Sequence, residues 1–272
     1  MARQNMSKTA VKPAGAELVT LRVVRSERIS PHFARVTLGG EDLGRFTPMG
    51  FDQWFRLFLP VGGDDSLSRV PARLTTMSYL KFLTVAKTER PVLRNYSVRA
   101  LRPAERELDV DFVLHGSPED GSAGPAATWA QACSPGDPVA LLDEGIGFNP
   151  DSSIREFRLV TDESGLPAVA GILRSLPEDA RGHALVEVPD EADRQELTAP
   201  EGVTVEWLVR DGDAPGALAL RTATGLPRPD GRFYGWVVGE SALPTGLRRH
   251  WVTSGVPKDD VMFCGYWKAA KH

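Results

Sequence analysis

The spacing of apolar residues changes near the middle of this 272-residue chain, and that change restricts the fold more than any other feature. From about Leu18 to Leu142, apolar and polar residues alternate in short runs, which is the period of β-strands. Beyond Asn149, apolar runs alternate with segments of helical spacing. A chain of this length can bury the cores of two domains. The two periods therefore predict an antiparallel β domain followed by an α/β domain.

Six segments with strand character, separated by Gly, Pro, Asp or Ser, make up the first half. They are LVTLRVVR, HFARVTL, QWFRLFLP, RNYSVR, ELDVDFVLH and DPVALLD. Such a set is typical of a small antiparallel barrel or sandwich. The stretch 61–93 interrupts them, and a loop of that length is usually a functional lid or a disordered insertion. Within it, TTMSYLKFLTVAK has the pattern of a short amphipathic helix.

The second half repeats a strand followed by a helix. Its predicted buried strands are FRLVT, HALVEV, VTVEWLVR, FYGWVVG and VMFCGYW. Its predicted helices are the stretch 166–176, DEADRQEL, GALALRTA and LPTGLRRHWV. Repeated β-α units predict a parallel sheet covered by helices. We place a flexible N-terminus at residues 1–17, the β-barrel domain at 18–150 and the α/β domain at 154–272.

Charge and cysteine content exclude several classes of function. The net charge of −4 shows no basic excess that would attract nucleic acid or an anionic membrane. Cys133 and Cys264 lack the spacing of a zinc site or redox pair, so we expect reduced thiols and no metal site. No apolar run reaches the length of a signal peptide core or a membrane span. We therefore expect a cytoplasmic protein without membrane insertion.

The segment RNYSVR, residues 94–99, combines two cations, an aromatic ring and a hydroxyl on one predicted strand. Alternation places Arg94 and Tyr96 on one face of that strand and Ser97 on the other. A cation for phosphate, a ring beside a ribityl chain and a hydroxyl for a ring nitrogen are what a flavin dinucleotide requires. On its own, however, the segment is explained better by solvated charges and a cross-strand aromatic residue.

Two further segments favour a pyrophosphate site. The strand ELDVDFVLHG ends in His115 and Gly116, and Gly124 and Pro125 then precede small residues and an apolar stretch. That pattern is typical of a helix start. Free amides and small side chains at a helix start let an anion approach closely. Each segment also has an ordinary structural explanation, as a strand-end histidine and as a surface helix.

Together, these segments resemble in order and spacing the siderophore-interacting protein family, which are flavin-dependent ferric-chelate reductases related to the ferredoxin-NADP reductase superfamily. The matching motifs are RxY(S/T)xR at 94–99, DFVLHG at 111–116, GPAxxWA at 124–130, DExxLPA at 162–168, WxxGE at 236–240 and GYW(R/K) at 265–268. The ordered set covers nearly the whole chain from about residue 18.

The resemblance implies a β-barrel that binds FAD, an α/β domain that binds NADH or NADPH, and a ferric siderophore as substrate. The cofactor-binding residues that it implies are Arg94, Tyr96, Ser97, Asp111, Val113, His115, Ala126, Ala127, Thr128, Asp162 and Glu163. Arg56 and Lys268 are the implied substrate residues, because cations speed the entry of anionic chelates. Family members often carry serine where Ala127 stands, and Thr128 is the alternative side chain for a phosphate.

In the implied reaction, NAD(P)H reduces the flavin by hydride transfer, and single electrons then pass to chelated iron. Reduction releases Fe(II), because hard oxygen donors hold the ferric ion better than the softer ferrous ion. No protein acid, base or nucleophile is required, so we predict no catalytic side chain.

The sequence does not decide which electron donor the protein uses. Glu187, Asp190 and Glu191 beyond the second α/β strand favour NADH, and Arg194 leaves NADPH open. No G-x-G-x-x-G follows the first α/β strand. A general or ferredoxin-dependent flavin reductase therefore remains an alternative, as does a non-catalytic flavin- or siderophore-binding module. We expect a monomer, with ferredoxin as an alternative partner.

Overall fold

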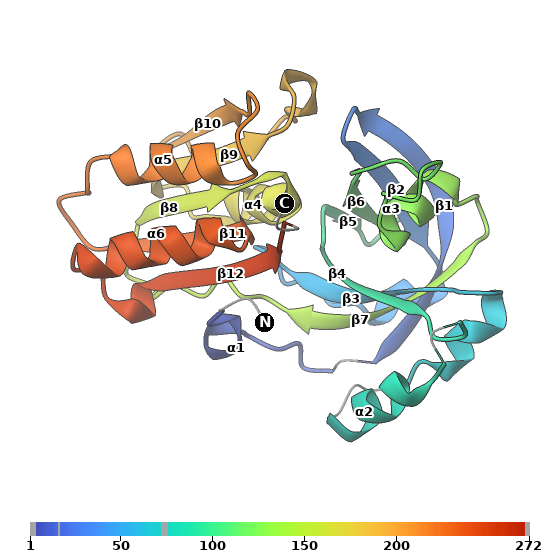
Figure 1. The fold of residues 1–272 in the computed structure, drawn as a ribbon. Coiled ribbons are helices and arrows are strands. Elements are labelled where there is room, and N and C mark those ends of the chain that lie inside the picture. Colours follow the sequence, from blue (N-terminus) through green and yellow to red (C-terminus); the bar gives the residue numbers. More distant parts are fainter. Residues whose placement is uncertain (1–3, 16, 72–75, 87, 270–272) are drawn as a thin grey trace. The chain divides into compact units, whose positions relative to one another are not determined.

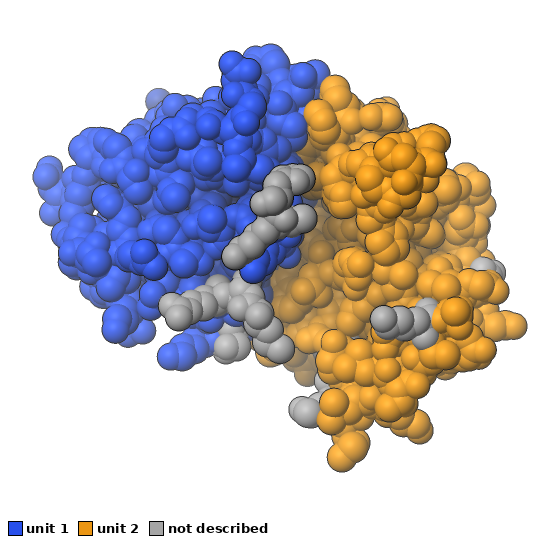
Figure 2. All heavy atoms as spheres, viewed as in Figure 1, with its two compact units in different colours: residues 1–11, 50–52, 146–272 blue, residues 12–49, 53–145 orange. Residues whose placement is uncertain are grey.

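The structure is a computed structural model, and it describes residues 4–15, 17–71, 76–86 and 88–269. It divides into two compact units, which Figure 2 draws in different colours. The β unit consists of residues 12–49 and 53–145. The α/β unit consists of residues 1–11, 50–52 and 146–272.

A seven-stranded antiparallel sheet forms the β unit, with the order β4-β3-β7-β1-β2-β6-β5. The strands are β1 (Leu18–Ser30), β2 (Phe33–Gly39), β3 (Trp54–Leu59), β4 (Val92–Ser97), β5 (Ala100–Arg102), β6 (Glu107–Val113) and β7 (Pro138–Gly145). The two outer strands, β4 and β5, follow each other in the chain, so the sheet curls around one core (Figure 1). Between them, the Val98 amide donates to the carbonyl of Gln53 and the Arg99 amide to that of Asp109. The predicted antiparallel barrel is confirmed.

The predicted strands of the first half are confirmed, and β5 was missed because three residues are too few to show alternation. The helices of the β unit are η1 (Glu41–Arg45), η2 (Asp64–Arg69), α2 (Thr76–Thr84) and α3 (Pro125–Ala132). The helix expected at 75–87 is confirmed as α2, while Thr75 and Lys87 lie outside the described residues. Phe82 anchors α2, since its buried ring packs edge-on against Phe58 with centroids 5.6 Å apart. The described part of the 61–93 interruption is therefore packed on the barrel.

The α/β unit is built on a five-stranded parallel sheet with the order β10-β9-β8-β11-β12. The strands are β8 (Glu156–Thr161), β9 (Arg181–Val188), β10 (Val203–Val209), β11 (Phe233–Glu240) and β12 (Val261–Trp267). The helices are α1 (Met6–Thr9), η3 (Glu163–Gly165), α4 (Leu166–Ser175), η4 (Glu191–Asp193), α5 (Ala217–Gly225), α6 (Ala242–Thr253) and η5 (Lys258–Asp260). Helices α5 and α6 cover one face of the sheet, and α4 lies behind it (Figure 1). The predicted parallel α/β sheet is confirmed.

One predicted helix differs from the structure. DEADRQEL forms only the short turn η4, which the Asp190 side chain caps at its start by accepting from the Ala192 amide. The backbone is extended again at Arg194, so no longer helix forms. The described part of the N-terminal segment contains α1, and the flexibility predicted for residues 1–17 stays a prediction. Its Asn5 side chain donates to the carbonyl of Val261 and accepts from the amide of Phe263. Because Asn5 and its two partners lie 256 and 258 residues apart, no local sequence pattern predicts these hydrogen bonds.

Asp52 connects the short segment 50–52 to the rest of the α/β unit through hydrogen bonds. Its side chain is buried, and Oδ1 accepts from the amides of Gly147 at 2.9 Å and Phe148 at 2.8 Å. Oδ2 accepts from Trp236 Nε1 at 3.2 Å. Burial raises the pKa of this carboxyl above its usual range. One side chain therefore joins three chain segments that would otherwise leave buried donors unpaired.

We predict that Asp52→Ala lowers the free energy of unfolding by roughly 2–4 kcal/mol, because three buried donors lose their acceptor. Thermal unfolding followed by circular dichroism measures the loss. Asp151→Asn is the control, since Asp151 is exposed and its carboxylate pairs with Ser153 and, at 3.7 Å, with Arg232. Equal melting temperatures for the wild type and Asp52→Ala would contradict this role.

Candidate functional site

Three of the motif segments meet in the β unit through one aromatic cluster. Tyr96 near the end of β4 packs on Phe112 of β6, with ring centroids 4.4 Å apart. Phe112 in turn lies 5.6 Å from the ring of Trp129 on α3. The barrel therefore gathers the end of β4, the end of β6 and α3, which are separate in sequence.

A close contact joins the end of β6 to the start of α3. A Cβ added to Gly124 would lie 3.1 Å from Cε1 and 3.4 Å from Nε2 of His115, so the imidazole occupies the space that a side chain would fill. Gly116 has φ +66°, and a Cβ there would lie 2.6 Å from the backbone of Ser122. Only glycine allows this left-handed turn and this approach. The two glycines thereby set His115, which is exposed, beside the first turn of the helix.

The first turn of α3 presents backbone donors without side-chain competition. Gly124 is the N-cap and supplies no side-chain cap, and Pro125 has no N–H. The amides of Ala126 and Ala127 lie where a helix has no internal acceptor, whereas Thr128 N bonds to Gly124 O at 2.9 Å. The two alanine methyl groups point into the core. No acidic residue occupies the first turn, so this end of α3 suits an anion.

The residues of β4 supply a cation, a phenol and a hydroxyl. Arg94 is exposed, and its Nη1 donates to Leu93 O at 2.8 Å. Burial raises the pKa of the Tyr96 phenol, so it stays a neutral donor. Ser97 lies directly across from Trp54 of β3 and shares its face. The indole Nε1 of Trp54 is buried without an acceptor in the described chain, and the alternation in QWFRLF could have identified this residue.

Asp111 and Val113 of β6 both make contacts within the barrel. The Asp111 carboxylate is fully buried and accepts two hydrogen bonds from Arg35, at 2.7 and 2.9 Å. Arg99 Nε lies 3.4 Å from its second oxygen. Val113 is the last residue of β6 and pairs with Phe33. Its ion pairs place Arg35 and Arg99 beside Asp111 in the barrel, and the predicted role of Asp111 in holding the flavin stays a prediction.

Arg56 is one of the two predicted substrate cations. Its Nε lies 2.6 Å from Oε1 of Glu144, and its guanidinium stands over the Tyr79 ring at 5.8 Å from the centroid. Lys12 also pairs with Glu144. The carboxylate of Glu144 therefore offsets part of the positive charge here. The other predicted cation, Lys268, is exposed and directly follows β12 in the α/β unit.

In the α/β unit, Asp162 lies at the carboxyl end of β8 with its oxygens fully engaged. Oδ1 accepts from the amide and the hydroxyl of Ser164, at 2.9 and 2.5 Å. Oδ2 accepts from the amide of Glu240 at 2.6 Å and from Trp267 Nε1 at 3.0 Å. A Cβ on Gly239 would lie 2.7 Å from Oδ2, which explains the glycine of the WxxGE motif. Asp162 thus joins β8, β11 and β12.

Two further carboxylates proposed for the nucleotide, those of Glu163 and Glu187, also accept hydrogen bonds within the α/β unit. Glu163 accepts two hydrogen bonds from Arg210, both at 2.8 Å. Glu187 is fully buried and accepts from the amides of Gly216 at 2.7 Å and Ala219 at 2.9 Å, at the start of α5. Asp162, Glu163 and Glu187 therefore position the carboxyl edge of the sheet, and the nucleotide-binding role predicted for Asp162 and Glu163 stays a prediction. Their role in shaping that edge could not be read from residue type alone.

Asp190 and Glu191, which follow β9, are exposed, whereas Asp193 of η4 is buried. Asp190 caps η4, and Glu191 pairs with Arg194 at 2.8 Å. Both follow the carboxyl end of β9, the edge at which α/β sheets bind ligands. The preference for NADH stays a prediction, and of the three acidic residues behind it Asp190 and Glu191 are exposed.

These features define the class of a two-unit protein that pairs a flavin-binding barrel with a nucleotide-binding α/β sheet. Residues 22–146 match the family model of the siderophore-interacting FAD-binding domain, and residues 154–270 match that of the siderophore-interacting protein. The chain therefore belongs to the siderophore-interacting protein family, and its cofactor is FAD.

Named relatives agree with this assignment. The chain is 32% identical to the NADPH-dependent ferric-chelate reductase of Escherichia coli, over 92% of each chain. It is 29% identical to the ferric vibriobactin reductase ViuB of Vibrio cholerae, over 93% of this chain and 90% of the relative. The crystal structure of a siderophore utilization protein from T. fusca superposes with a TM-score of 0.77 at 31% identity, and 97% of each chain is covered.

We predict that Gly124→Ala weakens FAD binding about tenfold, the equivalent of one hydrogen bond to a charged group. The added methyl group displaces the His115 ring from the first turn of α3. Fluorescence titration of the apoprotein with FAD measures the affinity. The matched control is Gly44→Ala in η1, where an added Cβ meets nothing within 4 Å. Unaltered FAD affinity in Gly124→Ala would show that this contact does not shape the site.

A second prediction concerns the pH dependence of stability. Burial, reinforced by the neighbouring carboxylate of Glu163, raises the pKa of Asp162 to about 7 from a usual value of 3.8. Between these two pH values the folded chain holds a proton that the unfolded chain has lost. The free energy of unfolding should therefore fall as the pH rises from about 4 to 7, and this contribution should level off above 7.

Asp162→Asn tests this, because asparagine keeps the shape but does not titrate. From pH 5 to pH 7, the melting temperature of the wild type should fall relative to that of Asp162→Asn. A difference that is constant with pH would contradict the raised pKa.

Proposed function

We propose that this protein is an FAD-dependent ferric-siderophore reductase that uses NADH or NADPH to reduce chelated Fe(III) and release Fe(II). The observation that carries the proposal is the junction of His115 with the start of α3, beside β4. It supplies the donors that a dinucleotide pyrophosphate requires. The named ferric reductases among the relatives support the choice of substrate.

The residues of the β unit fit FAD by their chemistry. The amides of Ala126 and Ala127, with Thr128 beside them, would hold the pyrophosphate. Arg94 is exposed and can turn its guanidinium to a phosphate. On the adjoining face of β3 and β4, Ser97 offers a hydroxyl and Trp54 a buried N–H that has no acceptor among the described residues. A bound polar group would satisfy that N–H, as buried polar groups normally are.

When bound, FAD supplies the exchange between two-electron and one-electron chemistry that links a nicotinamide to iron. The chain's own part is to bind and orient. Tyr96, held against Phe112, fixes the end of β4, while the buried pair of Asp111 and Arg35 fixes the end of β6. Asp162 and Glu163 order the carboxyl edge of the α/β sheet, where we place the nicotinamide nucleotide.

We assign substrate attraction to Arg56 and Lys268. Both would draw in anionic ferric chelates through long-range attraction, since Lys268 is exposed and Arg56 is 28% exposed. Glu144 tunes this attraction, because it pairs with Arg56 and Lys12. Iron here is cargo held by its own chelator, so the substrate requires no metal ligands from the protein.

We place the reaction in the cytoplasm and expect a monomer. The nicotinamide donor is cytoplasmic, and Cys133 and Cys264 are free thiols, as a reducing compartment favours. Within the described ranges, every helix is too short or too polar to reach across a lipid bilayer. Ferredoxin remains the alternative donor.

Anaerobic reduction of the FAD-loaded protein tests the function. We expect NADH or NADPH to bleach the flavin absorbance, and a ferric siderophore then to restore it while a chromogenic Fe(II) chelator reports released iron. Bleaching without Fe(II) release would identify a general flavin reductase. Bleaching by reduced ferredoxin alone would make ferredoxin the donor, and no bleaching by any donor would leave a binding module.

The charge arrangement around Arg56 makes a further prediction. Arg56→Gln and Lys268→Gln should each slow the reduction of an anionic ferric chelate severalfold at low salt, whereas Glu144→Gln should speed it by removing a repelling carboxylate. Salt should reduce all three effects, because the Debye length shortens to about 8 Å at physiological ionic strength. Stopped-flow oxidation of the reduced flavin gives the second-order rates.

An uncharged ferric chelate is the matched control and should react alike with all the variants. If Glu144→Gln slows the anionic chelate, Glu144 helps to hold the substrate and the assigned charge balance is wrong.

A further inference from the structure

A cavity of about 260 Å³ opens in the α/β unit at the amino-terminal half of its sheet. Arg158 of β8 and His183 of β9 lie side by side in the sheet register and form part of its floor. The end of α5 with the following loop, and the end of α6, enclose it. Asp162 and Glu163 follow the opposite end of β8. We call this cavity the Arg158 pocket, and it is separate from the edge assigned to the nicotinamide nucleotide.

The polar end of the Arg158 pocket contains an incompletely paired cation. The Arg158 side chain is only 11% exposed, and its buried Nη1 has no hydrogen-bond partner in the described chain. The nearest carboxylate oxygen, from Glu156, is 3.5 Å away, which exceeds the usual 2.7–2.9 Å of a charge-assisted bond. Burial lowers the pKa of Arg158. A buried guanidinium with an unused N–H is costly unless an acceptor reaches it.

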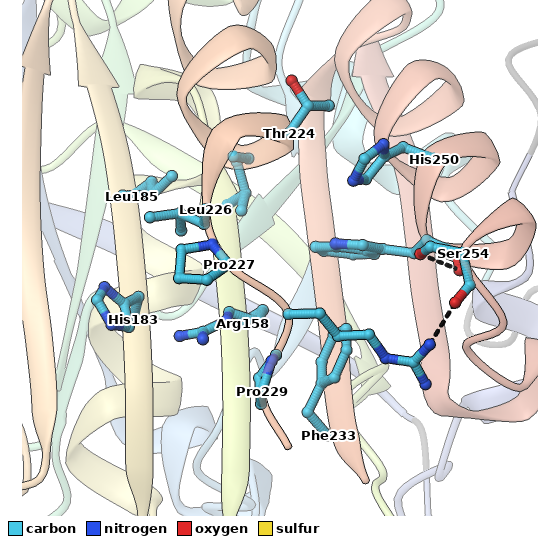
Figure 3. Close-up of a pocket in the computed structure, with 14 residues that line it drawn as sticks. Arg158, His183, Leu185, Thr224, Leu226, Pro227, Pro229, Phe233, His250 and Ser254 are labelled. Carbon is cyan, nitrogen blue, oxygen red and sulfur yellow. Dashed lines mark hydrogen bonds between the residues drawn. The ribbon is translucent and has the colours of Figure 1, made fainter. Parts of the chain in front are cut away.

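His183 completes this polar end. Burial and the charge of Arg158 lower the pKa of its imidazole, so it is neutral at pH 7 and can donate or accept one hydrogen bond. In Figure 3 the guanidinium of Arg158 is directed toward His183 and away from Phe233. The only other charged lining residue in the described chain is Arg228, which donates to the carbonyl of Ser254. The lining therefore carries positive charge and no carboxylate.

Most of the remaining lining is apolar, apart from Thr224, His250 and Ser254. Leu226, Pro227 and Pro229 come from the loop after α5. Phe233 and Trp251 meet edge to face, with centroids 5.9 Å apart. Trp251 can lie this close to the sheet because Gly235 has no side chain, and a Cβ there would lie 2.5 Å from the indole ring. Such walls suit a flat apolar body.

We propose that the Arg158 pocket binds a small aromatic monocarboxylate. The guanidinium fork matches a carboxylate, and the aromatic and proline walls match a ring. A free phosphate would leave those walls unused, and the nearby carboxylates of Glu156 and Glu206 disfavour a multiply charged ligand. The volume is just below the range of about 300–1,000 Å³ that drug-sized ligands fill, so the ligand is smaller than these. This site goes beyond the proposed reductase activity and does not depend on it.

Calorimetry and saturation-transfer NMR on the FAD-loaded protein test the proposal, with benzoate as the probe. We expect saturable binding of one benzoate per chain. Arg158→Gln should weaken it at least tenfold, and benzamide, which has the same ring without the charge, should bind at least tenfold more weakly than benzoate. Arg249→Gln is the control for net charge, because Arg249 is exposed on α6 and does not line the pocket.

Thr224→Trp supplies a second variant that keeps Arg158 and fills the cavity from α5. It should also abolish benzoate binding, while its FAD affinity and far-ultraviolet circular dichroism stay as in the wild type. Saturable binding that persists unchanged in both Arg158→Gln and Thr224→Trp would overturn the proposal. Failure of the wild type to bind benzoate, or equal affinity for benzamide, would overturn it as well.

Discussion

The contact between the imidazole of His115 and Gly124 is the constraint on which the candidate flavin site depends. It requires a glycine at the N-cap of α3, and therefore a helix start without a side-chain cap. The unpaired amides of the first turn follow from that requirement. Gly116 adds the left-handed turn that brings the helix back to β6. A local steric condition thereby leaves backbone donors free of side-chain caps at the candidate site.

Buried carboxylates do the positioning in both units. Asp111 holds Arg35 and Arg99 in the barrel, while Asp162 gathers donors from β11 and β12. Glu187 occupies the start of α5. Each accepts several hydrogen bonds, which offsets the cost of taking the charge out of water. The acidic residues of the family motifs in this chain therefore order the strand ends.

The two ends of the parallel sheet have different chemistry. The carboxyl end carries the ordered acidic cluster around Asp162 and Glu163, and it is the end at which such sheets bind nucleotides. The amino-terminal half contains the Arg158 pocket, with a cation that lacks a close partner. Helix α6 runs between these regions, since it begins just after β11 and its last turn lines the pocket. One α/β unit thus offers two chemically distinct surfaces.

The sequence by itself determined the antiparallel barrel, the parallel α/β sheet and nearly every strand, because burial imposes periods of 2 and 3.6 residues that can be read locally. Its resemblance to the family also predicted a flavin site at RNYSVR, His115 and the start of α3. Only the tertiary structure decided what the acidic residues do, since the donors of Asp162 come from segments up to 105 residues away. The ordering of Asn5, the pairing of Arg56 with Glu144 and the isolation of Arg158 were likewise decided there. Such contacts depend on where distant segments meet in space, and residue type and spacing do not predict these meeting points.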